Sequence, residues 1–350
     1  MFGGVRDRPP LPRRPGDDDL RGDERDAAAG HRARPARGVS APAGPRVLGI
    51  VLNYNGRDLT LQTVGSLLAS DFPKLDLLVV DNGSTDGSHE AVGERYPGVR
   101  RLRTEENLGI SGGLNLGFRV GLDEGYDFVM PMNNDIEVAP DMVTELVRLA
   151  GSTPRAGCVG PKCYYFFGDR RRLWSAGGRL RWREAVTSER GMGRIDRGQF
   201  DRDEPVGYVN GALMLIRRAA LLATGLWDPV YHVSVEDADW CARTKRAGWQ
   251  CWYAHRARLW HMVSPTTGGY TAGRTYRTGR STAIFVRRFG GPAGRASWLF
   301  WSAVAFPAAL VRELPRGNAG AVLAKYRGMR DGWRLELPPS PPPISGGSPT

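Results

Sequence analysis

Val47–Tyr54 reads VLGIVLNY, an unbroken apolar run that is rich in β-branched side chains. Such a run is typical of a strand buried on both faces of a parallel sheet. Leu75–Val80 (LDLLVV) repeats the pattern. Between the two, Asp58–Ala69 spaces its apolar residues as a helix does, and Asp58 is suited to cap that helix. The three segments predict a β-α-β unit.

The alternation of strand and helix continues downstream of this unit. The next predicted elements are a short strand at Arg100–Leu102, a helix at Gly113–Leu122, a strand at Phe128–Met132 and a helix at Asp141–Ala150 after Pro140. The alternation predicts an α/β fold with a mostly parallel, doubly wound sheet.

After about residue 150 the chain becomes rich in Gly, Arg and Trp, and the strand candidates become shorter. We expect strands at Val206–Ile216 and Gln250–Trp260. Glu236–Ala247 (EDADWCARTKRA) is predicted to be a helix, because acids in its first turn and basic residues near its end both suit the helix dipole.

Both ends of the chain have a composition that disfavours a packed core. Residues 1–45 carry many Arg, Asp, Pro and Gly and few large apolar side chains, and residues 338–350 read PPSPPPISGGSPT. Burial in such segments cannot offset the entropy of ordering them, so we predict two disordered tails. Gly294–Val311 is apolar but shorter than the ~20 residues that span a bilayer, and Pro307 interrupts it. A core helix and a helix lying in the membrane interface both fit this segment.

The charge balance narrows the classes of partner. Lys and Arg number 49 against 37 Asp and Glu, giving a formal net charge of +12, which attracts phosphates, anionic membranes or nucleic acid. The sequence offers no recognition helix and no basic-aromatic motif, so we expect no nucleic acid partner. The N-terminus lacks the pattern of a secretory signal, which predicts a cytosolic active site. The four cysteines form no CxxC pair and no zinc spacing, and are predicted to be reduced structural thiols.

Polar clusters follow three of the predicted strands. They are Asn53-Tyr54-Asn55, the loop DNGSTDGS that starts at Asp81, and Asn133-Asn134-Asp135. In open α/β sheets ligands bind where strands end, so these clusters predict a ligand site at one sheet edge. Asp81 can accept hydrogen bonds from a base or ribose. The alternative for the loop taken alone is that its acids cap the following helix.

The cluster that ends in Asp135 has the chemistry of a metal site. Its oxygen ligands suit Mg²⁺ or Mn²⁺ that also holds two phosphates. Asn107–Gly117 (NLGISGGLNLG) is rich in Gly but has neither the Lys of a P-loop nor a dinucleotide fingerprint. Its glycines are expected to let the backbone approach a donor sugar closely.

Two further candidates lie in the second half of the chain. Glu236 and Asp237 start a predicted helix and can place an acid at a cleft wall, although acids at a helix start are also ordinary. His261 follows the strand that ends in Leu259-Trp260, and a structural role is the alternative to metal binding for a single histidine.

The ordered set IVLNYNG, VVDNGSTDGS, NLGISGGLNLG, NNDIE, GALMLIRR, EDADWCAR and LWHMVS resembles glycosyltransferase family 2, of the GT-A fold, and especially its rhamnosyltransferase-like members. The resemblance covers about residues 46–290. It implies a nucleotide-sugar-binding half at 46–150 and an acceptor half at 151–290. The apolar, arginine-flanked pattern of Gly294–Val311 predicts a C-terminal helical segment at 291–337, with membrane association as one of its two alternatives.

The resemblance also implies roles for individual residues. Asp237 matches the catalytic base, Asp135 the metal-binding acid, and His261 a residue that contacts the metal or the diphosphate. The expected nucleotide-sugar-binding residues are Asn53, Asn55, Asp81, Asn82, Ser84, Asn107, Gly112, Asn115, Asn133 and Asn134. Acceptor or diphosphate contacts are expected from Glu236, Trp240 and Arg280.

The sequence departs from the family pattern at two places. Asn133 replaces the first acid of the DxD-type motif, and Ser281 stands after Arg280 where relatives often carry Asn. The Q-x-x-R-W motif of processive synthases is absent, so a single-addition enzyme is implied.

The expected activity is inverting, metal-dependent transfer of a sugar from a nucleotide-diphosphate donor to a hydroxyl acceptor, in cell-surface polysaccharide or glycoconjugate synthesis. dTDP-rhamnose is the first donor candidate and UDP-sugars come next. The acceptor is a lipid-linked glycan or a soluble molecule, and the enzyme is cytosolic or peripheral on the inner face of the plasma membrane. The alternative is a nucleotide-sugar or glycan binding protein without turnover, which would need no base. A Rossmann oxidoreductase requires a glycine fingerprint where this chain has NYNGRD.

Overall fold

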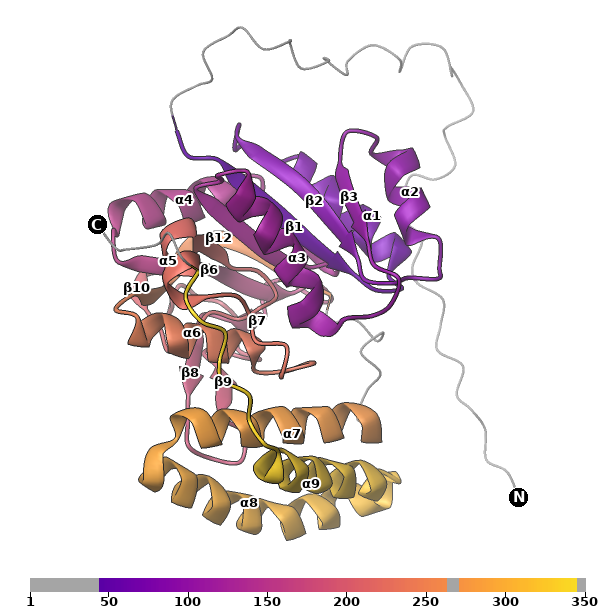
Figure 1. Ribbon diagram of the computed structural model, residues 1–350, viewed down its shortest axis with the longest axis vertical. Helices are drawn as coiled ribbons and strands as arrows, with labels where there is room; N and C mark the ends of the chain where they lie inside the picture. The colour runs from indigo at the N-terminus through magenta and orange to yellow at the C-terminus, as the bar shows by residue number, and fades with distance from the viewer. Residues whose placement is uncertain (1–43, 263–270, 345–350) are drawn as a thin grey trace, which may run out of the picture. The chain divides into compact units, whose positions relative to one another are not determined.

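The computed structural model describes residues 44–262 and 271–344 (Figure 1). Its centre is a ten-stranded sheet in the order β10-β12-β6-β11-β4-β1-β2-β3, with β5 paired to β12 and β7 to β6. The strands are β1 (Val47–Asn53), β2 (Leu75–Asp81), β3 (Arg100–Arg103), β4 (Phe128–Asn133), β5 (Ile136–Val138), β6 (Ala156–Tyr165), β7 (Leu173–Ser175), β10 (Glu204–Pro205), β11 (Leu215–Arg217) and β12 (Gln250–His261). The pairs among β4, β1, β2 and β3 are parallel, as is the long β6–β12 pair, while β11 joins the two groups in the antiparallel sense.

Helices cover both faces of this sheet. The helices are α1 (Arg57–Leu68), α2 (Ser88–Arg95), α3 (Gly109–Asp123), α4 (Met142–Ser152), α5 (Arg218–Thr224), α6 (Glu236–Arg246), α7 (Ala272–Phe289), α8 (Gly291–Glu313) and α9 (Ala319–Arg334). Val47 and Val51 of β1 pack with α1, α2 and α4, whereas Leu48 and Ile50 pack with α3, α5, α6 and α7. This alternation explains why the first strand is apolar throughout, and it confirms the predicted α/β class.

The start of α1 differs from the prediction. Asp58 does not cap the helix, which begins at Arg57 after Gly56. The backbone amides of Gly56 and Arg57 instead donate to Asn53 Oδ1 at 3.2 Å and Asp86 Oδ2 at 3.0 Å. Side chains from the ends of other elements therefore satisfy amides that a local cap would otherwise bind.

The predicted strand at Val206–Ile216 is mostly wrong. Only Leu215–Arg217 forms a strand, β11, and the residues before it run as a loop. Gly207 lies so close to Gly178 that a Cβ there would be 2.8 Å from the Gly178 carbonyl oxygen. Instead of pairing as a strand, this loop contacts a hairpin of β8 (Gly178–Leu180) and β9 (Thr187–Glu189). The apolar pattern of the segment does not reveal these contacts.

The glycines of α3 serve packing instead of a ligand. A Cβ at Gly113 would lie 2.5 Å from Leu52 Cδ1, and one at Gly117 would lie 2.5 Å from Ile50 Cγ2. Gly121 meets Val129 in the same way. Three glycines spaced four apart form one stripe of the helix, and they let α3 lie directly on β1 and β4. Gly113 and Gly117, which belong to the stretch expected to approach a donor sugar, therefore face the sheet instead.

Helices α7, α8 and α9 form a separate layer, which the β8–β9 hairpin reaches (Figure 1). α7 and α9 cross in close contact, because a Cβ at Gly279 or Gly328 would overlap the backbone of the other helix. In α8 only Gly294, Trp298, Ser302 and Glu313 are buried. The core-helix alternative for Gly294–Val311 is therefore wrong for most of its length. Among the described residues, no helix combines the length and apolarity needed to cross a bilayer.

The predicted tails fall mainly on residues that the structure does not describe, 1–43 and 345–350. Residues 338–344 are described, and they lie against the domain without regular secondary structure. Ile344 donates its backbone amide to Leu222, and Pro338 accepts from Arg288 at 3.0 Å. For these residues the structure differs from the predicted disorder, because backbone hydrogen bonds and the apolar Ile344 fix them to α5 and α7.

Candidate active site

The three polar clusters meet at one edge of the sheet, as the sequence predicts. Asn53 and Asp81 are directly paired at the ends of the parallel strands β1 and β2. Asn133, at the end of β4, pairs with Leu52 on the other side of β1. The register alone brings the clusters together, because parallel neighbours end at the same edge.

Asp81 presents one carboxylate oxygen that no described residue binds. Its Oδ1 accepts the Ser84 amide at 2.8 Å, whereas Oδ2 is buried and has no hydrogen-bond partner among the described residues. The side chain is only 1% exposed. A buried carboxylate oxygen left in this state is costly, so it is suited to accept a hydrogen bond from a ligand.

Asn53, Asn55, Ser84 and Asn134 bind mainly one another. Asn53 Oδ1 accepts from Thr60 Oγ1 at 2.7 Å and from Asn134 Nδ2 at 2.8 Å. Asn53 Nδ2 donates to Ser84 Oγ at 3.1 Å, and the same hydroxyl accepts the Asn55 amide at 2.9 Å. These side chains hold the strand-end loops in one arrangement around Asp81.

A second group of predicted ligand residues fixes the start of α3 and its neighbours. Asn82 donates to Asn107 Oδ1 at 3.0 Å and accepts the Leu108 amide at 3.1 Å. Asn115 pairs both ends of its amide with the backbone of Trp227, at 2.8 and 3.0 Å. A Cβ at Gly112 would lie 2.7 Å from Leu108 Cβ, within the same helix start.

Asp135 and His261 lie together although they are far apart in the sequence. His261 Nε2 is 3.0 Å from Asp135 Oδ1, and the Met262 amide donates to the Asp135 carbonyl at 2.8 Å. Pairing of β5 with the end of β12 brings them together. His261 Nδ1 is buried without a partner among the described residues. The Trp174 and His261 rings pack at an angle of 76°, with their centroids 4.4 Å apart. A carboxylate oxygen and an imidazole nitrogen in contact form a donor set that fits Mn²⁺.

Asp237 stands at the start of α6 and is held by backbone amides. Oδ2 accepts the Gly211 amide at 2.8 Å and Oδ1 the Ala238 amide at 2.7 Å. Burial raises the pKa of the Asp237 carboxyl above its usual range. Burial, followed by the charge of Asp237, also raises the pKa of Glu236. Two adjacent acids with raised pKa values in a cavity are suited to proton transfer near neutral pH.

The backbone that presents Asp237 is strained. Ser234 and Val235, immediately before α6, both have positive φ values, 69° and 59°. A β-branched residue in the left-handed region is an outlier, and conformations of this kind cost of order 1–3 kcal/mol.

A cavity of about 260 Å³ opens beside Asp237. Four parts of the chain supply its polar walls: the β8–β9 hairpin, the loop before β11, α6 and the C-terminal helices. Its polar lining includes Glu189, Tyr208, Asn210, Glu236, Asp237 and Lys325.

Consecutive residues connect this cavity to the strand-end edge. Gly211 donates to Asp237, and the next residue, Ala212, accepts the Asn133 amide at 3.0 Å. The end of β4 and the carboxylate of Asp237 are therefore fixed to the same short piece of backbone.

With this geometry in place, comparison with known proteins identifies the family. The model of "Glycosyl transferase family 2" matches residues 50–224. An N-acetylglucosaminyl-diphospho-decaprenol L-rhamnosyltransferase of Mycobacterium tuberculosis is 32% identical over 244 residues, covering 63% of this chain and 76% of the relative. The chain belongs to glycosyltransferase family 2.

Other similarities agree with this family. A poly-beta-1,6-N-acetyl-D-glucosamine synthase of Staphylococcus epidermidis is 23% identical over 62% of this chain and 50% of its own length. GalNAc-T7, solved with UDP, GalNAc and Mn²⁺, superposes with a TM-score of 0.58 at 16% identity, over 71% of this chain and 48% of that one. A mannosyltransferase from Pyrobaculum calidifontis, solved with GDP-Man and Mn²⁺, gives 0.53 at 18% identity, over 85% and 89%. The fold is thus the GT-A fold of glycosyltransferases.

Two predicted acceptor contacts of this glycosyltransferase point elsewhere in the structure. Trp240 is fully buried and donates its indole N–H to the Gly225 carbonyl at 2.9 Å. Arg280 donates to the Val230 carbonyl at 2.9 Å. Neither lines the cavity beside Asp237, whereas Glu236 does. Both instead fix the segment between α5 and α6.

Most polar residues of the cavity were not predicted from the sequence, among them Glu189, Tyr208 and Asn210. Glu189 accepts from the Tyr208 hydroxyl and from Asn210 Nδ2, the latter at 2.9 Å. Burial raises the pKa of Tyr208, which therefore stays a neutral donor. The polar Asn210 within the otherwise apolar Val206–Ile216 was the available signal, since a buried strand would not place an amide there.

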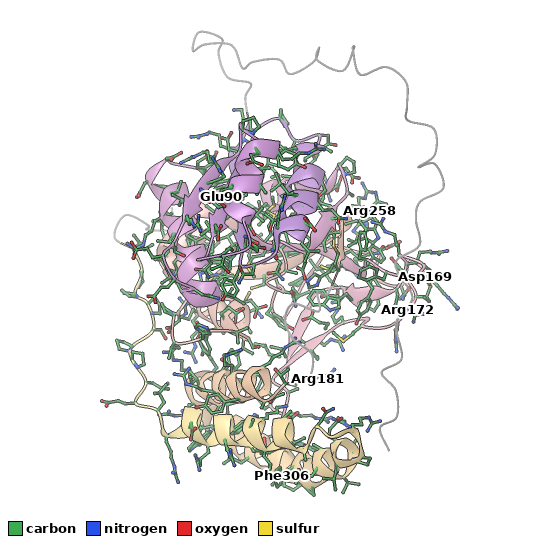
Figure 2. All side chains as sticks on the ribbon, turned by 90° about the vertical axis from the view of Figure 1, so that its right-hand side faces the viewer. Glu90, Asp169, Arg172, Arg181, Arg258 and Phe306 are labelled. Carbon is green, nitrogen blue, oxygen red and sulfur yellow. The ribbon has the colours of Figure 1, made fainter. Side chains whose placement is uncertain are left out.

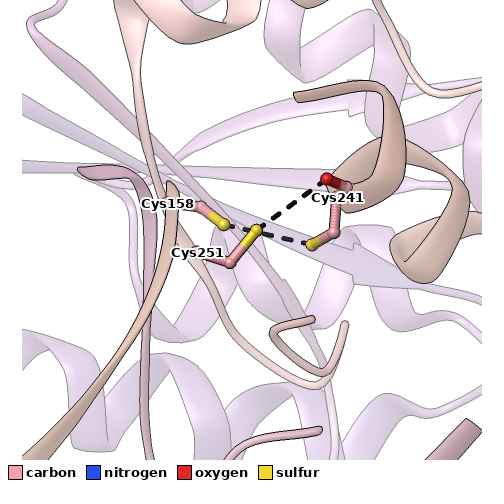
Figure 3. A group of neighbouring side chains, drawn as sticks. All are labelled: Cys158, Cys241 and Cys251. Carbon is pink, nitrogen blue, oxygen red and sulfur yellow. Dashed lines mark hydrogen bonds between the residues drawn. The ribbon is translucent and has the colours of Figure 1, made fainter. Parts of the chain in front are cut away.

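Three cysteines meet in the core of the sheet (Figure 3). Cys158 and Cys251 pair across β6 and β12, and Cys241 of α6 lies 4.0 Å from Cys158, sulfur to sulfur. All are free thiols that are at most 1% exposed, and Cys251 and Cys241 donate to backbone carbonyls at 3.9 Å. Sequence spacing could not reveal this cluster, because strand pairing creates it. Full burial and carbonyl contacts suit thiols with a packing role.

Proposed function

We propose that this glycosyltransferase transfers rhamnose from a nucleotide-diphosphate donor to a hydroxyl of a lipid-linked glycan, with inversion at the anomeric carbon. The observation that carries the proposal is the position of Asp237. Its carboxylate lines a cavity large enough for a sugar, carries a raised pKa and is tied to the donor edge through Gly211 and Ala212. A binding protein without turnover would have no use for such a group.

The donor would occupy the edge where β1, β2 and β4 end. Asp81 Oδ2 is the acceptor that we assign to the base or ribose, and the network around Asn53 and Ser84 keeps it in place. The relative from M. tuberculosis is a rhamnosyltransferase by name, and two structural neighbours were solved with nucleotides or nucleotide sugars. These similarities support a nucleotide sugar, with dTDP-rhamnose as the first candidate.

A divalent metal ion fits the pair Asp135 and His261. His261 Nε2 lies 3.0 Å from Asp135 Oδ1, so the two side chains can offer a nitrogen and an oxygen donor at one place, and both structural neighbours contain Mn²⁺. When bound, the ion would neutralise the charge that develops on the departing diphosphate. We assign Asp135 and His261 to hold it, with Mg²⁺ as the alternative to Mn²⁺.

The chain's own residues would carry the proton. The acceptor hydroxyl loses its proton to Asp237 as its oxygen attacks the anomeric carbon, and the bond to the diphosphate oxygen breaks on the opposite face. The amides of Gly211 and Ala238 orient the carboxylate. Glu236 shares the cavity with Asp237 but makes no hydrogen bond through Oε2 to any described residue. The raised pKa of Glu236 favours its protonated form, and a protonated carboxyl cannot compete with Asp237 as the base.

A lipid-linked acceptor suits the outer face of α8. Phe300, Trp301 and Val311 are 60, 38 and 75% exposed, and the Arg183 guanidinium lies 4.8 Å from the centre of the Trp301 ring. Exposed apolar and aromatic side chains beside arginines are typical of a surface that binds anionic lipid. We therefore place the enzyme peripherally on a membrane.

The test is a transfer assay with purified protein, Mn²⁺, dTDP-rhamnose and N-acetylglucosaminyl-diphospho-farnesol. We expect a product heavier by one rhamnose in mass spectrometry, and the anomeric configuration opposite to the donor's in NMR. Transfer only from UDP- or GDP-sugars would overturn the rhamnose assignment. Binding of donors without transfer to any acceptor would favour the alternative of a binding protein.

A further inference from the structure

An apolar groove of about 570 Å³ lies between α8 and α9. Two aromatic pairs form much of its wall. The rings of Trp298 and Trp333 stack with their centroids 5.7 Å apart, and those of Phe306 and Tyr326 meet edge-on with centroids 4.5 Å apart. Leu299 and Met329 add aliphatic surface. Figure 2 shows Phe306 on the outer side of the helical layer, away from the sheet. The volume lies in the range of small-molecule sites.

Positive side chains line this groove. Arg330 and Arg334 line it and no acid does among the described residues around it, although Arg330 forms an ion pair with the neighbouring Asp331 at 2.9 Å. Arg334 is therefore the cation more available to an anionic group. An apolar wall with cationic groups beside it is complementary to an amphiphile that has a long hydrocarbon chain and an anionic head.

Helix α9 connects the groove to the catalytic cavity. Lys325 lines the cavity that contains Asp237, and it forms an ion pair with Glu184 there. Tyr326, the next residue, lines the groove. The side chains of neighbouring helix residues point about 100° apart, so one turn of α9 contributes to both the groove and the cavity beside Asp237. A molecule with its sugar at Asp237 can therefore run its chain along α9.

We propose that the groove between α8 and α9 binds the isoprenoid chain of a polyprenyl-diphosphate acceptor, with Arg330 and Arg334 beside the chain's phosphate end. This inference rests on the proposed lipid-linked acceptor and assigns its chain to a site. A bilayer surface alone would contact the outward side chains of α8 and leave the walls between the helices unused. The groove walls, by contrast, surround a single chain.

Two neighbouring substitutions on α8 separate these possibilities. Ala303 is exposed and lines the groove, so Ala303→Trp would fill it. Val304 is 48% exposed and does not line it, so Val304→Trp adds the same bulk to the outer face. Both positions are at the surface, and equal thermal melting of the two variants and the wild type checks the fold.

The kinetic experiment compares N-acetylglucosaminyl-diphosphate carrying a farnesyl or a butyl chain. We expect the wild type to have a KM at least about 10-fold lower for the farnesyl compound, because more apolar surface is buried. Ala303→Trp should remove this advantage in KM, and Val304→Trp should keep it. Equal KM values for both chains in the wild type, or equal effects of the two substitutions, would overturn the proposal.

A binding arm separates failure of the groove from failure of the proposed function. Equilibrium dialysis with farnesyl diphosphate alone, without donor, should show binding that Ala303→Trp abolishes and Val304→Trp retains. If that result holds but no sugar is transferred, the groove stands and the transfer reaction falls. If the farnesyl and butyl acceptors are glycosylated equally and farnesyl diphosphate does not bind, the proposed transfer reaction is supported and the proposed groove site is ruled out.

Discussion

His261 Nε2 lies 3.0 Å from Asp135 Oδ1, at the point where β12 pairs with β5. The two residues are the only predicted metal ligands, and the fold brings them into contact across 126 positions of sequence. Their contact gives the first prediction a physical basis.

Asp135→Ala is expected to lose most transferase activity, because it removes the carboxylate of the proposed metal pair. EDTA should silence the wild type until Mn²⁺ or Mg²⁺ is restored, and Mn²⁺ should raise the melting temperature of the wild type but not of the variant. Asp123→Asn, at the exposed end of α3, is the control and should behave like the wild type. Full activity in EDTA contradicts the metal assignment.

Asp237→Asn is nearly isosteric but cannot accept the proton of the acceptor hydroxyl. We expect kcat to fall by at least about 100-fold with donor and metal affinity retained, as measured by steady-state kinetics and donor titration. Glu236→Gln should do less damage. Near-normal turnover of Asp237→Asn, or a product that keeps the donor's anomeric configuration, would rule out the displacement mechanism.

Replacing Glu236 by Gln is expected to raise the stability of the fold by an amount that depends on pH. The pKa of Glu236 is raised in the folded state, so the folded protein holds a proton that the unfolded chain has lost above about pH 4.3. Stability from this group is therefore present at low pH and is lost as pH rises towards the folded pKa. Glu236→Gln removes the charged form, and thermal melting should show it more stabilising at pH 8.5 than at pH 5. An equal shift at both pH values would show that burial of the charge is not the cause.

Gly117→Ala should destabilise the fold by about 1–3 kcal/mol, because its Cβ would press on Ile50 Cγ2. The matched control is Gly151→Ala in α4, where a Cβ meets nothing within 4 Å. There the change should stabilise by roughly 0.5–1 kcal/mol through the lower entropy of the unfolded chain. Urea denaturation measures both, and a stabilising Gly117→Ala would show that α3 can move off the sheet.

Vesicles test the membrane face of α8. The protein should sediment with anionic liposomes at low salt, and binding should weaken in high salt because the arginine contribution is screened. Replacing Phe300 and Trp301 by Ser should reduce binding, whereas Leu323→Ser on α9 is the control for loss of an exposed apolar side chain. Protein that stays in the supernatant with anionic vesicles at low salt counts against this surface.

The strands of the first half of the domain were largely predictable, because burial leaves a direct mark on composition. Val47–Asn53 and Leu75–Asp81 are mainly apolar because helices cover both faces, and the polar residues at their ends had to meet at one edge. Long-range pairing left no such mark. No local sequence pattern predicts that β12 brings His261 to Asp135, or that Cys158, Cys241 and Cys251 lie together.

The polar residues of the site show a second limit of sequence reasoning. An asparagine at a strand end can bind a ligand or another asparagine with the same chemistry. Asn82 and Asn115 satisfy backbone groups of α3 and Trp227, whereas Asp81 keeps one oxygen unpaired among the described residues. Only three-dimensional hydrogen-bond accounting distinguishes the two uses.

Val235, with its left-handed backbone just before Asp237, has a consequence for anyone engineering this enzyme. Val235→Gly would relieve that strain, but it would also remove a side chain that is only 8% exposed and packs in the core. The two effects on stability oppose each other, whereas a flexible glycine and the lost packing would both loosen the start of α6, which carries Asp237. The valine thus joins the direction of the carboxylate to the packing of the core, and this position is the one to leave untouched.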